Sequence, residues 1–494
     1  MRLASLFLLG AAAMGQTAAP EYFRPAHTLA GIGVSRDDLS DDLVETRTNM
    51  MIESQTFVIL REPEAISGAK RITGDRKLQA LFRQASERSG IPATQLEAMA
   101  YLESWGDPKA QSVAGPRGIM QLAQATARRI GLRVVQTTRY RIVKEKVQTR
   151  NAKGKLVTRV VRHKVPYLVR GRDDRTSPEK VIPAVADYLV RLEQKFGGRD
   201  WAIWAYHCGE GCVAEMQELT RQARGIPKDR FTVARMFFSC SPVWNRELYQ
   251  AVQMQMDRDY SPTYWFRIKR AEQLLESYRR DPDAFVAAAE DYKMQFEPGG
   301  EPVRRAPHRL SVWLKRADLQ YHTSDDIRAG MGTLLVRPFD RPDYFGYQLH
   351  IEPGQQQDLE YFSQASPAAI GTLLYIAFET RRLWDELKSS ERFRPLEVTS
   401  LVEPEEFVAK NARAEAWSHE SGQVFDIDYS GLPPGEYECL RFVLNDLGWE
   451  GYLGFVEDGK DTLHIGCSPS SRDFFTSIYT EVAGQFAQNA KRDE

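Results

Sequence analysis

The stretch YLESWGDPKAQSVAGPRGIMQLAQATARRIGL, residues 101–132, is the most informative part of this 494-residue chain. Its acid, Glu103, follows Leu96, Met99 and Ala100 at helical spacing, so it lies on the apolar stripe of a predicted helix. A turn rich in Ser, Gly and Gln comes next. Because burial disfavours the charged form of a carboxyl group, we expect Glu103 to stay protonated near neutral pH. In that state it can act as a general acid.

This stretch resembles the signature of the soluble, goose-lysozyme-like lytic transglycosylases. The residues that carry the resemblance occur in a fixed order: Glu103-Ser104, Ser112, Gly115, Gly118-Ile119-Met120-Gln121-Leu122, Thr126-Ala127 and Gly131-Leu132. The resemblance implies a mainly α-helical, lysozyme-like domain over residues 76–296 that acts without a cofactor. Its substrate would be the glycan strand of peptidoglycan, cleaved between MurNAc and GlcNAc with formation of 1,6-anhydroMurNAc. Glu103 would serve first as the general acid and then as the general base.

The same resemblance points to four substrate-binding candidates. Ser112, Gln121 and Tyr206 match family positions that contact the substrate or support the acid, and Glu179 falls where the family has an acidic residue at a helix start. Structural roles are the alternative, because Ser112 and Gln121 can satisfy loop backbone groups and a first-turn Glu is favoured by the helix dipole.

Two segments depart from the family pattern. The family's Asn-Ile-x-x-Gly is replaced by residues 181–185, VIPAV, and its Ala-Tyr-Asn-Ala-Gly by residues 205–209, AYHCG. These departures leave the acid in place and alter the expected contacts with the sugars.

A second chemical cluster occupies the last quarter of the chain. His419, Asp426 and His464 offer two imidazoles and one carboxylate, which would leave an open position for water on Zn²⁺, and Asp461 is a candidate general base. The order resembles that of the D-alanyl-D-alanine carboxypeptidase and dipeptidase group of zinc peptidases, with His-x-x-Gly-x-x-x-Asp followed by an acid three residues before His. In that group an Arg shortly upstream stabilises the carbonyl oxygen, whereas this chain has Glu403.

The zinc-peptidase resemblance implies an α+β domain over residues 311–494 that cleaves the peptide stem or cross-link of peptidoglycan. Residues 297–310, which include a Pro-Gly-Gly-Glu-Pro break, are the expected linker. Residues 20–75 are weakly patterned, so we expect an N-terminal extension. Residues 133–172 change to a period of two around Asn-Ala-Lys-Gly, which predicts an inserted β-hairpin. The hairpin has thirteen Lys or Arg and one Glu, and contacts polyanions or forms a solvated ribbon.

Composition limits the function classes. With 42% hydrophobic residues, 27% charged residues and a net charge of −1, the chain is typical of globular proteins, and we expect no nucleic-acid partner. Residues 1–19 resemble a secretory signal, so we expect export to the periplasm or the extracellular space, with no transmembrane segment in the mature chain. The oligomeric state is left open.

The five cysteines suggest at most two disulfides in an exported chain. One bridge per half is the expectation, with Cys439 and Cys467 as the more natural pair. The alternative is that all five are reduced and buried.

Three hypotheses follow. The first is an exported enzyme with a glycan-cleaving domain and a peptide-cleaving zinc domain. In the second only the glycan is cleaved, and the zinc domain is a metal-stabilised anchor. The third is a non-catalytic peptidoglycan-binding scaffold in which one or both sites are degenerate.

Overall fold

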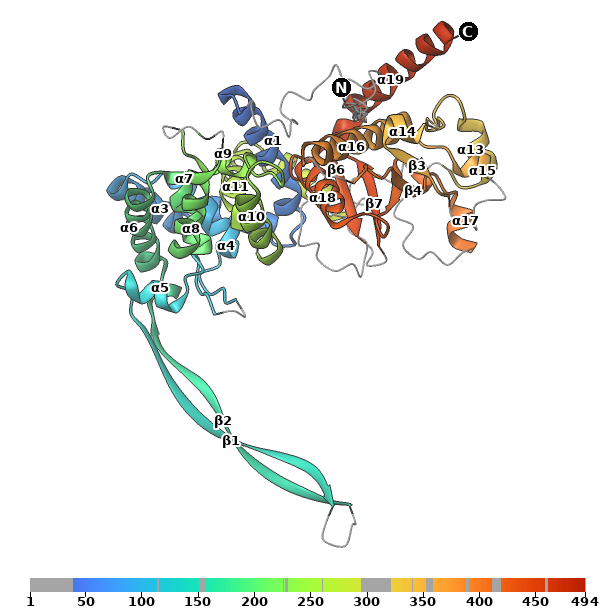
Figure 1. Ribbon diagram of the computed structural model, residues 1–494. Helices are drawn as coiled ribbons and strands as arrows, with labels where there is room; N and C mark the ends of the chain where they lie inside the picture. Colours follow the sequence, from blue (N-terminus) through green and yellow to red (C-terminus); the bar gives the residue numbers. More distant parts are fainter. Residues whose placement is uncertain are drawn as a thin grey trace, which may run out of the picture. The chain divides into compact units, whose positions relative to one another are not determined.

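The computed structural model describes residues 39–112, 115–150, 156–224, 226, 230–259, 261–294, 321–339, 341–351, 359–387, 391–410, 419–457 and 461–493. These residues form two compact units, one within residues 36–306 and the other within residues 307–494 (Figure 1). The first is mainly helical and the second is α+β, which confirms the two predicted fold classes at this level. The expected signal, residues 1–19, and the expected linker, residues 297–310, lie outside the described residues.

Helix α4 (Ala93–Ser104) is the buried helix of the first unit. Seven consecutive residues, from Gln95 to Tyr101, are buried, and the helix ends where Trp105 adopts a left-handed conformation. It packs against α2, α3 and α11. The other helices of this unit are α1 (Asp41–Leu60), α2 (Ala65–Gly74), α3 (Arg76–Ser89), α5 (Gln124–Arg129), α6 (Pro178–Phe196), α7 (Arg199–Cys208), α8 (Glu210–Gln222), α9 (Val233–Phe238), α10 (Arg246–Arg258), α11 (Tyr264–Arg280) and α12 (Pro282–Met294).

Within residues 20–75, where we expected an N-terminal extension, the described residues from 39 onward form α1 and α2, and residues 20–38 lie outside the described residues. Both helices belong to the body of the first unit: α1 packs against α9, α11 and α12, and α2 packs against α4. The sequence of α1 does not indicate that this helix packs within the first unit, because some of its polar residues are also buried. Arg47 and Gln55 are buried beside Met51 and Phe57, so the helix shows no apolar stripe.

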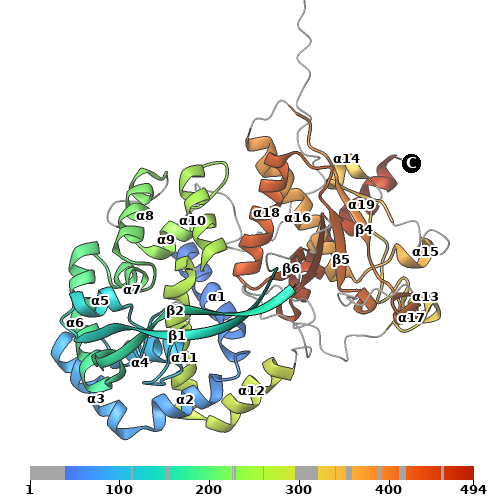
Figure 2. The ribbon, with the colours of Figure 1, turned by 90° about the horizontal axis from the view of Figure 1, so that it is seen from below.

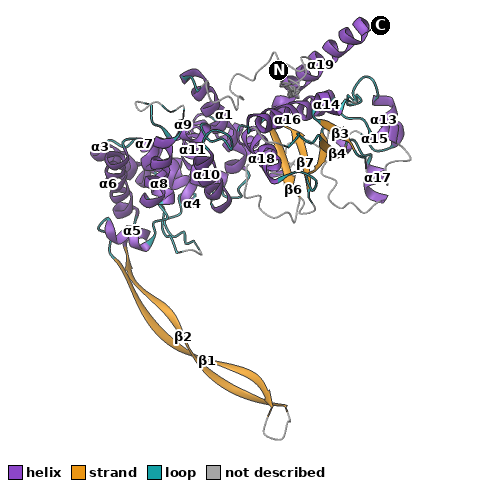
Figure 3. Ribbon diagram, viewed as in Figure 1, coloured by secondary structure: helices purple, strands orange, loops and turns teal. Residues whose placement is uncertain are grey.

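Two long strands lie between α5 and α6 in the chain. Strand β1 (Val134–Arg150) pairs antiparallel with β2 (Leu156–Asp173), with Arg141 opposite Val165. The pair overlaps residues 133–172, where we predicted the inserted hairpin, and ends one residue beyond that stretch. Among the described residues, strands occur only here and in the sheet of the second unit (Figure 3).

The second unit is built on a five-stranded sheet in the order β3-β4-β5-β7-β6. Its strands are β3 (Tyr347–Leu349), β4 (Leu396–Ser400), β5 (Val424–Asp428), β6 (Leu453–Glu457) and β7 (Thr462–Cys467). Only β3 and β4 are parallel, and the other neighbours are antiparallel. The central strands β5 and β7 are almost entirely buried, which fits their apolar residues Phe425, Ile427, Leu463 and Ile465.

Three long helices accompany this sheet. Helix α16 (Pro367–Glu386) packs on β7, and α18 (Pro434–Trp449) packs on β6 (Figure 2). Helix α19 (Arg472–Asp493) crosses α16 at Gly371, where a Cβ atom would lie 1.9 Å from the Phe475 carbonyl oxygen. Shorter helices are α13 (Ser324–Gly330), α14 (Pro342–Phe345), α15 (Leu359–Phe362) and α17 (Glu405–Lys410).

The cysteines pair differently from the expectation. Cys208 and Cys212 form a disulfide between the end of α7 and the start of α8. The predicted bridge between Cys439 and Cys467 is wrong: both are buried thiols, as is Cys240. Cys439 lies within α18 and Cys467 ends β7, so each fills the apolar core as a small side chain. No helix in the described part of the chain is long and apolar enough to span a bilayer.

Candidate active site and candidate metal centre

Glu103 lies in the last turn of α4 and is half-buried. The hydroxyl of Tyr264, the first residue of α11, donates a hydrogen bond of 2.6 Å to Glu103 Oε1. Burial raises the pKa of Glu103 from 4.5 to about 7, although the Tyr264 hydrogen bond acts in the opposite direction. At neutral pH the carboxyl therefore populates both protonation states and can give or accept a proton.

The side chain of Tyr264 packs against the imidazole of His207. Its ring stacks on that of His207 at a centroid distance of 4.3 Å with an angle of 9° between the planes. Burial lowers the pKa of His207 to about 4, against an opposing effect of Asp259. The imidazole is thus neutral at pH 7, and it adds no positive charge that would favour the ionised form of Glu103.

Tyr206 lies one residue before this imidazole and joins α7 to the loop between α4 and α5, residues 105–123, which we call the signature loop. Its hydroxyl donates to the Met120 carbonyl oxygen. Burial raises the pKa of Tyr206, and the nearby charge of Glu103 adds to the effect. Tyr206 therefore belongs to the surroundings of the acid, and its part in substrate binding stays a prediction.

The other loop candidates make local backbone contacts. Gln121 Nε2 donates to the Gly118 carbonyl oxygen at 2.9 Å, and Gln121 itself has a φ of 40°. The Ser112 N–H donates to the Pro116 carbonyl oxygen at 3.1 Å, and the Ser112 carbonyl oxygen accepts from Gly115. These contacts match the structural role left open for Ser112 and Gln121. Their part in substrate binding stays a prediction.

Glu179 is exposed at the start of α6. Its carboxylate forms an ion pair of 2.7 Å with Lys77 of α3 and accepts a hydrogen bond of 2.9 Å from the Ser177 hydroxyl. The hydrogen bond from Lys77 is the main cause that lowers the pKa of Glu179 to about 2. Its contacts therefore join α3 to α6, which fits the helix-start alternative.

Arg175, which sequence reasoning missed, supports the signature loop from below. The buried guanidinium makes two hydrogen bonds to Asp173, of 2.8 and 2.9 Å, and donates to the carbonyl oxygens of Gly115 and Leu122. Its own carbonyl oxygen would lie 1.8 Å from a Cβ atom at Gly118, where φ is +77°. Only glycine fits there, which explains that position of the signature.

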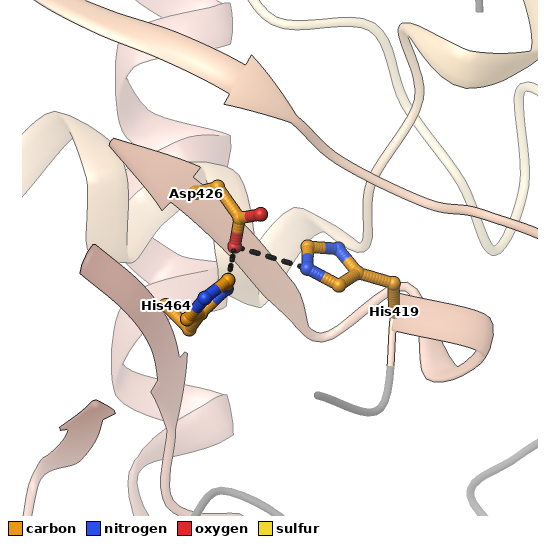
Figure 4. A group of neighbouring side chains, drawn as sticks. All are labelled: His419, Asp426 and His464. Carbon is orange, nitrogen blue, oxygen red and sulfur yellow. Dashed lines mark hydrogen bonds and ion pairs between the residues drawn. The ribbon is translucent and has the colours of Figure 1, made fainter. Parts of the chain in front are cut away.

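The predicted metal ligands of the second unit are brought together by neighbouring strands. Asp426 of β5 pairs directly with His464 of β7, so both side chains project from the same face. Asp426 Oδ1 lies 2.7 Å from His464 Nδ1 and 3.0 Å from His419 Nε2 (Figure 4). All three side chains are buried, and their candidate ligand atoms lie within 4.8 Å of one another.

The orientation of His419 suits metal binding. Its Nδ1 lies 2.6 Å from the Leu401 carbonyl oxygen, to which it donates, and this contact turns Nε2 toward Asp426. Burial opposes the charged imidazolium, but Asp426 and Glu403 outweigh it and raise the pKa of His419 to about 9. The cluster therefore favours a positive charge at its centre, and two imidazoles with one carboxylate are a donor set suited to Zn²⁺.

Asp461, the predicted general base, is exposed directly before β7 and has a φ of 64°. Its carbonyl oxygen accepts from the Tyr429 N–H at 2.9 Å. The structure thus places it near His464 along the chain but outside the buried cluster, and its catalytic role stays a prediction.

Comparisons with known proteins concern the first unit. Residues 80–146 match the family described as "Transglycosylase SLT domain", and this range includes Glu103 and its loop. A membrane-bound lytic murein transglycosylase F 2 of Alkalilimnicola ehrlichii is 43% identical over 224 residues, 44% of this chain and 36% of that protein. The membrane-bound lytic murein transglycosylase F of Alcanivorax borkumensis is 30% identical over 154 residues, 30% of this chain and 24% of that protein.

One of the similar proteins is viral. The peptidoglycan transglycosylase gp16 of Escherichia phage T7 is 31% identical over 138 residues, 28% of this chain and 8% of that protein. The chain thus spans little more than a third of the length of the first of these relatives and less of the other two. The match of residues 80–146 to the SLT-domain family and the similarity to these relatives support the resemblance that the signature predicted for the first unit.

Proposed function

We propose that the first unit is a lytic transglycosylase that cleaves the MurNAc–GlcNAc bonds of peptidoglycan. The observation that carries the proposal is the half-buried carboxyl of Glu103, whose pKa of about 7 lets one group act as acid and as base. Its position within the SLT-domain match and the names of the relatives support the choice of polymer.

In this mechanism Glu103 takes part in both proton transfers. Protonated Glu103 gives its proton to the glycosidic oxygen as the bond from the MurNAc C1 to that oxygen breaks. The C6 hydroxyl of the same MurNAc then attacks C1, and Glu103 takes the hydroxyl proton as the 1,6-anhydro ring closes. One carboxyl suffices because no water enters the product. Asp107, the next acid along the chain, is engaged by the Lys109 N–H at 2.8 Å.

Digestion of purified sacculi followed by mass spectrometry tests this function. Wild type should release anhydromuropeptides, and Glu103→Gln should reduce their release at least about 100-fold, the usual contribution of a general acid-base group. Glu218→Gln, the same change in an exposed ion pair of α8, is the control and should be fully active. Release by Glu103→Gln at the wild-type rate would refute the proposal.

We propose, second, that the other unit binds Zn²⁺ through His419, Asp426 and His464 and cleaves an amide of the peptide stem or cross-link. The buried convergence of these three donors favours it. Zinc, when bound, lowers the pKa of a coordinated water to about 7. Asp461 is the candidate base for that water. Peptide products that disappear with a chelator and in His419→Ala are expected; products that persist in both would exclude a metallopeptidase.

A scaffold function is the alternative. Binding of the protein to sacculi with no soluble products of either kind would leave only that reading. For either function we propose export to the periplasm or beyond, which the disulfide between Cys208 and Cys212 supports because such bonds persist in oxidising compartments.

A further inference from the structure

Glu403 lies behind the candidate metal centre. It follows β4, and its side chain is only 1% exposed. Ser400, the last residue of β4, donates a hydrogen bond of 2.5 Å from Oγ to Glu403 Oε1, and the Glu403 N–H lies 3.4 Å from the His419 carbonyl oxygen. The resemblance to zinc peptidases predicts an Arg near this place, but this chain has Glu403, whose carboxyl group is buried in the protein interior.

Ser400 connects Glu403 to two of the three candidate ligands. Its Oγ lies 3.4 Å from His419 Nδ1. In the register of β4 and β5, Ser400 is also directly opposite Asp426, which in turn is opposite His464. Glu403 therefore holds the hydroxyl at one end of a row of three strand residues, and two of the three candidate ligands, Asp426 and His464, occupy the rest of that row.

The contact between Glu403 and Ser400 matters for metal binding because Glu403 is an acidic residue. A carboxylate taken out of water is unfavourable unless a cation compensates it. Two buried acidic side chains meet His419: Asp426 contacts its Nε2 at 3.0 Å, and Glu403 reaches it through Ser400, whose Oγ lies 3.4 Å from Nδ1. Their combined charge of two matches a divalent cation bound by neutral imidazoles, whereas an Arg in the place of Glu403 would repel such a cation.

We propose that Glu403 is a positioning residue of the metal centre, whose buried carboxylate fixes Ser400 and His419 and adds a second negative charge that tightens the binding of Zn²⁺. The inference rests on the zinc site of the proposed function. It assigns to the charge reversal at this position a role in metal retention.

The test is the zinc affinity of the full chain, measured by competition with a chromophoric chelator at fixed pH. Loss of a group that supports a metal ligand typically weakens metal binding 10- to 100-fold, so Glu403→Gln should do so. The matched control is Glu436→Gln, because Glu436 is also fully buried in this unit but receives the Arg394 N–H instead. This control should bind zinc as wild type does.

Two further variants, Ser400→Ala and His419→Ala, distinguish failure of this inference from failure of the zinc site. Ser400→Ala retains the charge and releases the carboxylate, so it should weaken zinc binding less than Glu403→Gln; it also replaces that variant if circular dichroism shows misfolding. If folded Glu403→Gln binds zinc as tightly as wild type, the inference is wrong, although the zinc site itself stands. If Glu403→Gln misfolds, the same conclusion follows from wild-type affinity in Ser400→Ala. Equal and negligible zinc binding by wild type and His419→Ala overturns the zinc site, and the inference with it.

Discussion

At the scale of the residue, the chemistry proposed for the first unit depends on the protonation state of one carboxyl group. The pKa of Glu103 is raised from 4.5 to about 7, so the folded chain retains a proton that the unfolded chain loses near pH 4.5. Between these values the folded state binds more protons, and its free energy of unfolding decreases as the pH rises. A carboxyl suited to catalysis is thus a source of instability above neutral pH.

The first prediction compares wild type with Glu103→Gln, which cannot titrate. Denaturant unfolding at pH 5 and pH 8 should show that wild type loses more stability than the variant, because only wild type must ionise a half-buried carboxyl. Glycan cleavage by wild type should also fall as the pH rises through about 7, where the acid form disappears. Glu218→Gln should follow wild type in both measurements. The same loss of stability in Glu103→Gln would contradict the assignment.

The second prediction concerns Tyr264. Its hydrogen bond favours the ionised form of Glu103, so Tyr264→Phe should raise the pKa of Glu103 further. The alkaline limb of the pH–activity profile should move up by about one unit, since a hydrogen bond to a charged group is worth about 1.5–3 kcal/mol. Tyr278→Phe, on the same helix, is the control because its ring contacts Phe285. An unmoved limb would assign Tyr264 a packing role alone.

Sequence reasoning succeeded where the chemistry is local. Glu103 and its loop occupy a short stretch, and His419 and Asp426 are seven residues apart. Tyr264 is 161 positions from the acid that it contacts, and no motif surrounds it. The pattern likewise showed that Glu403 replaces an Arg, but only the fold shows that its carboxylate is buried behind His419.

At the scale of the element, the signature loop is defined by what supports it. Residues after the β1–β2 ribbon return to the loop, where Arg175 binds two of its carbonyl oxygens. The period of two predicted the strands, because alternation is a local property. The helices α1 and α2 were missed because their burial arises from contacts with α9, α11 and α12, far along the chain.

The third prediction tests that support. Gly118 and Gly131 both have positive φ, of 77° and 90°, but a Cβ atom meets the Arg175 carbonyl oxygen only at Gly118. Gly131→Ala should therefore lose about 1 kcal/mol of stability from backbone strain alone. Gly118→Ala should lose about 2 kcal/mol more, because backbone must move to admit the methyl group. Denaturant unfolding of both variants measures the difference, and equal losses would show that the close approach is unimportant.

At the scale of the whole molecule, the chain joins two units for which we propose unrelated chemistries. The SLT-domain match falls entirely in the first unit, and the three candidate zinc ligands fall in the second. The sequence predicted this division because the two motifs and their surrounding periodicities differ. Each proposed site is composed of residues from one unit. A substitution or metal removal at one site should therefore affect that unit and leave the other unchanged.

The fourth prediction is the effect of metal removal. Zinc bound by His419, Asp426 and His464 would link a short helical turn to β5 and β7, so it stabilises the folded second unit by about 2.7 kcal/mol at a hundredfold excess over its dissociation constant. A chelator should lower the thermal unfolding transition of that unit and leave the other transition and the release of anhydromuropeptides unchanged. Without chelator, His419→Ala should already show the lowered unfolding temperature of the second unit. Glu103→Gln should keep the zinc-dependent unfolding transition of that unit. If the chelator instead stopped glycan cleavage, the metal would serve the first unit, and the separation of the two chemistries would be wrong.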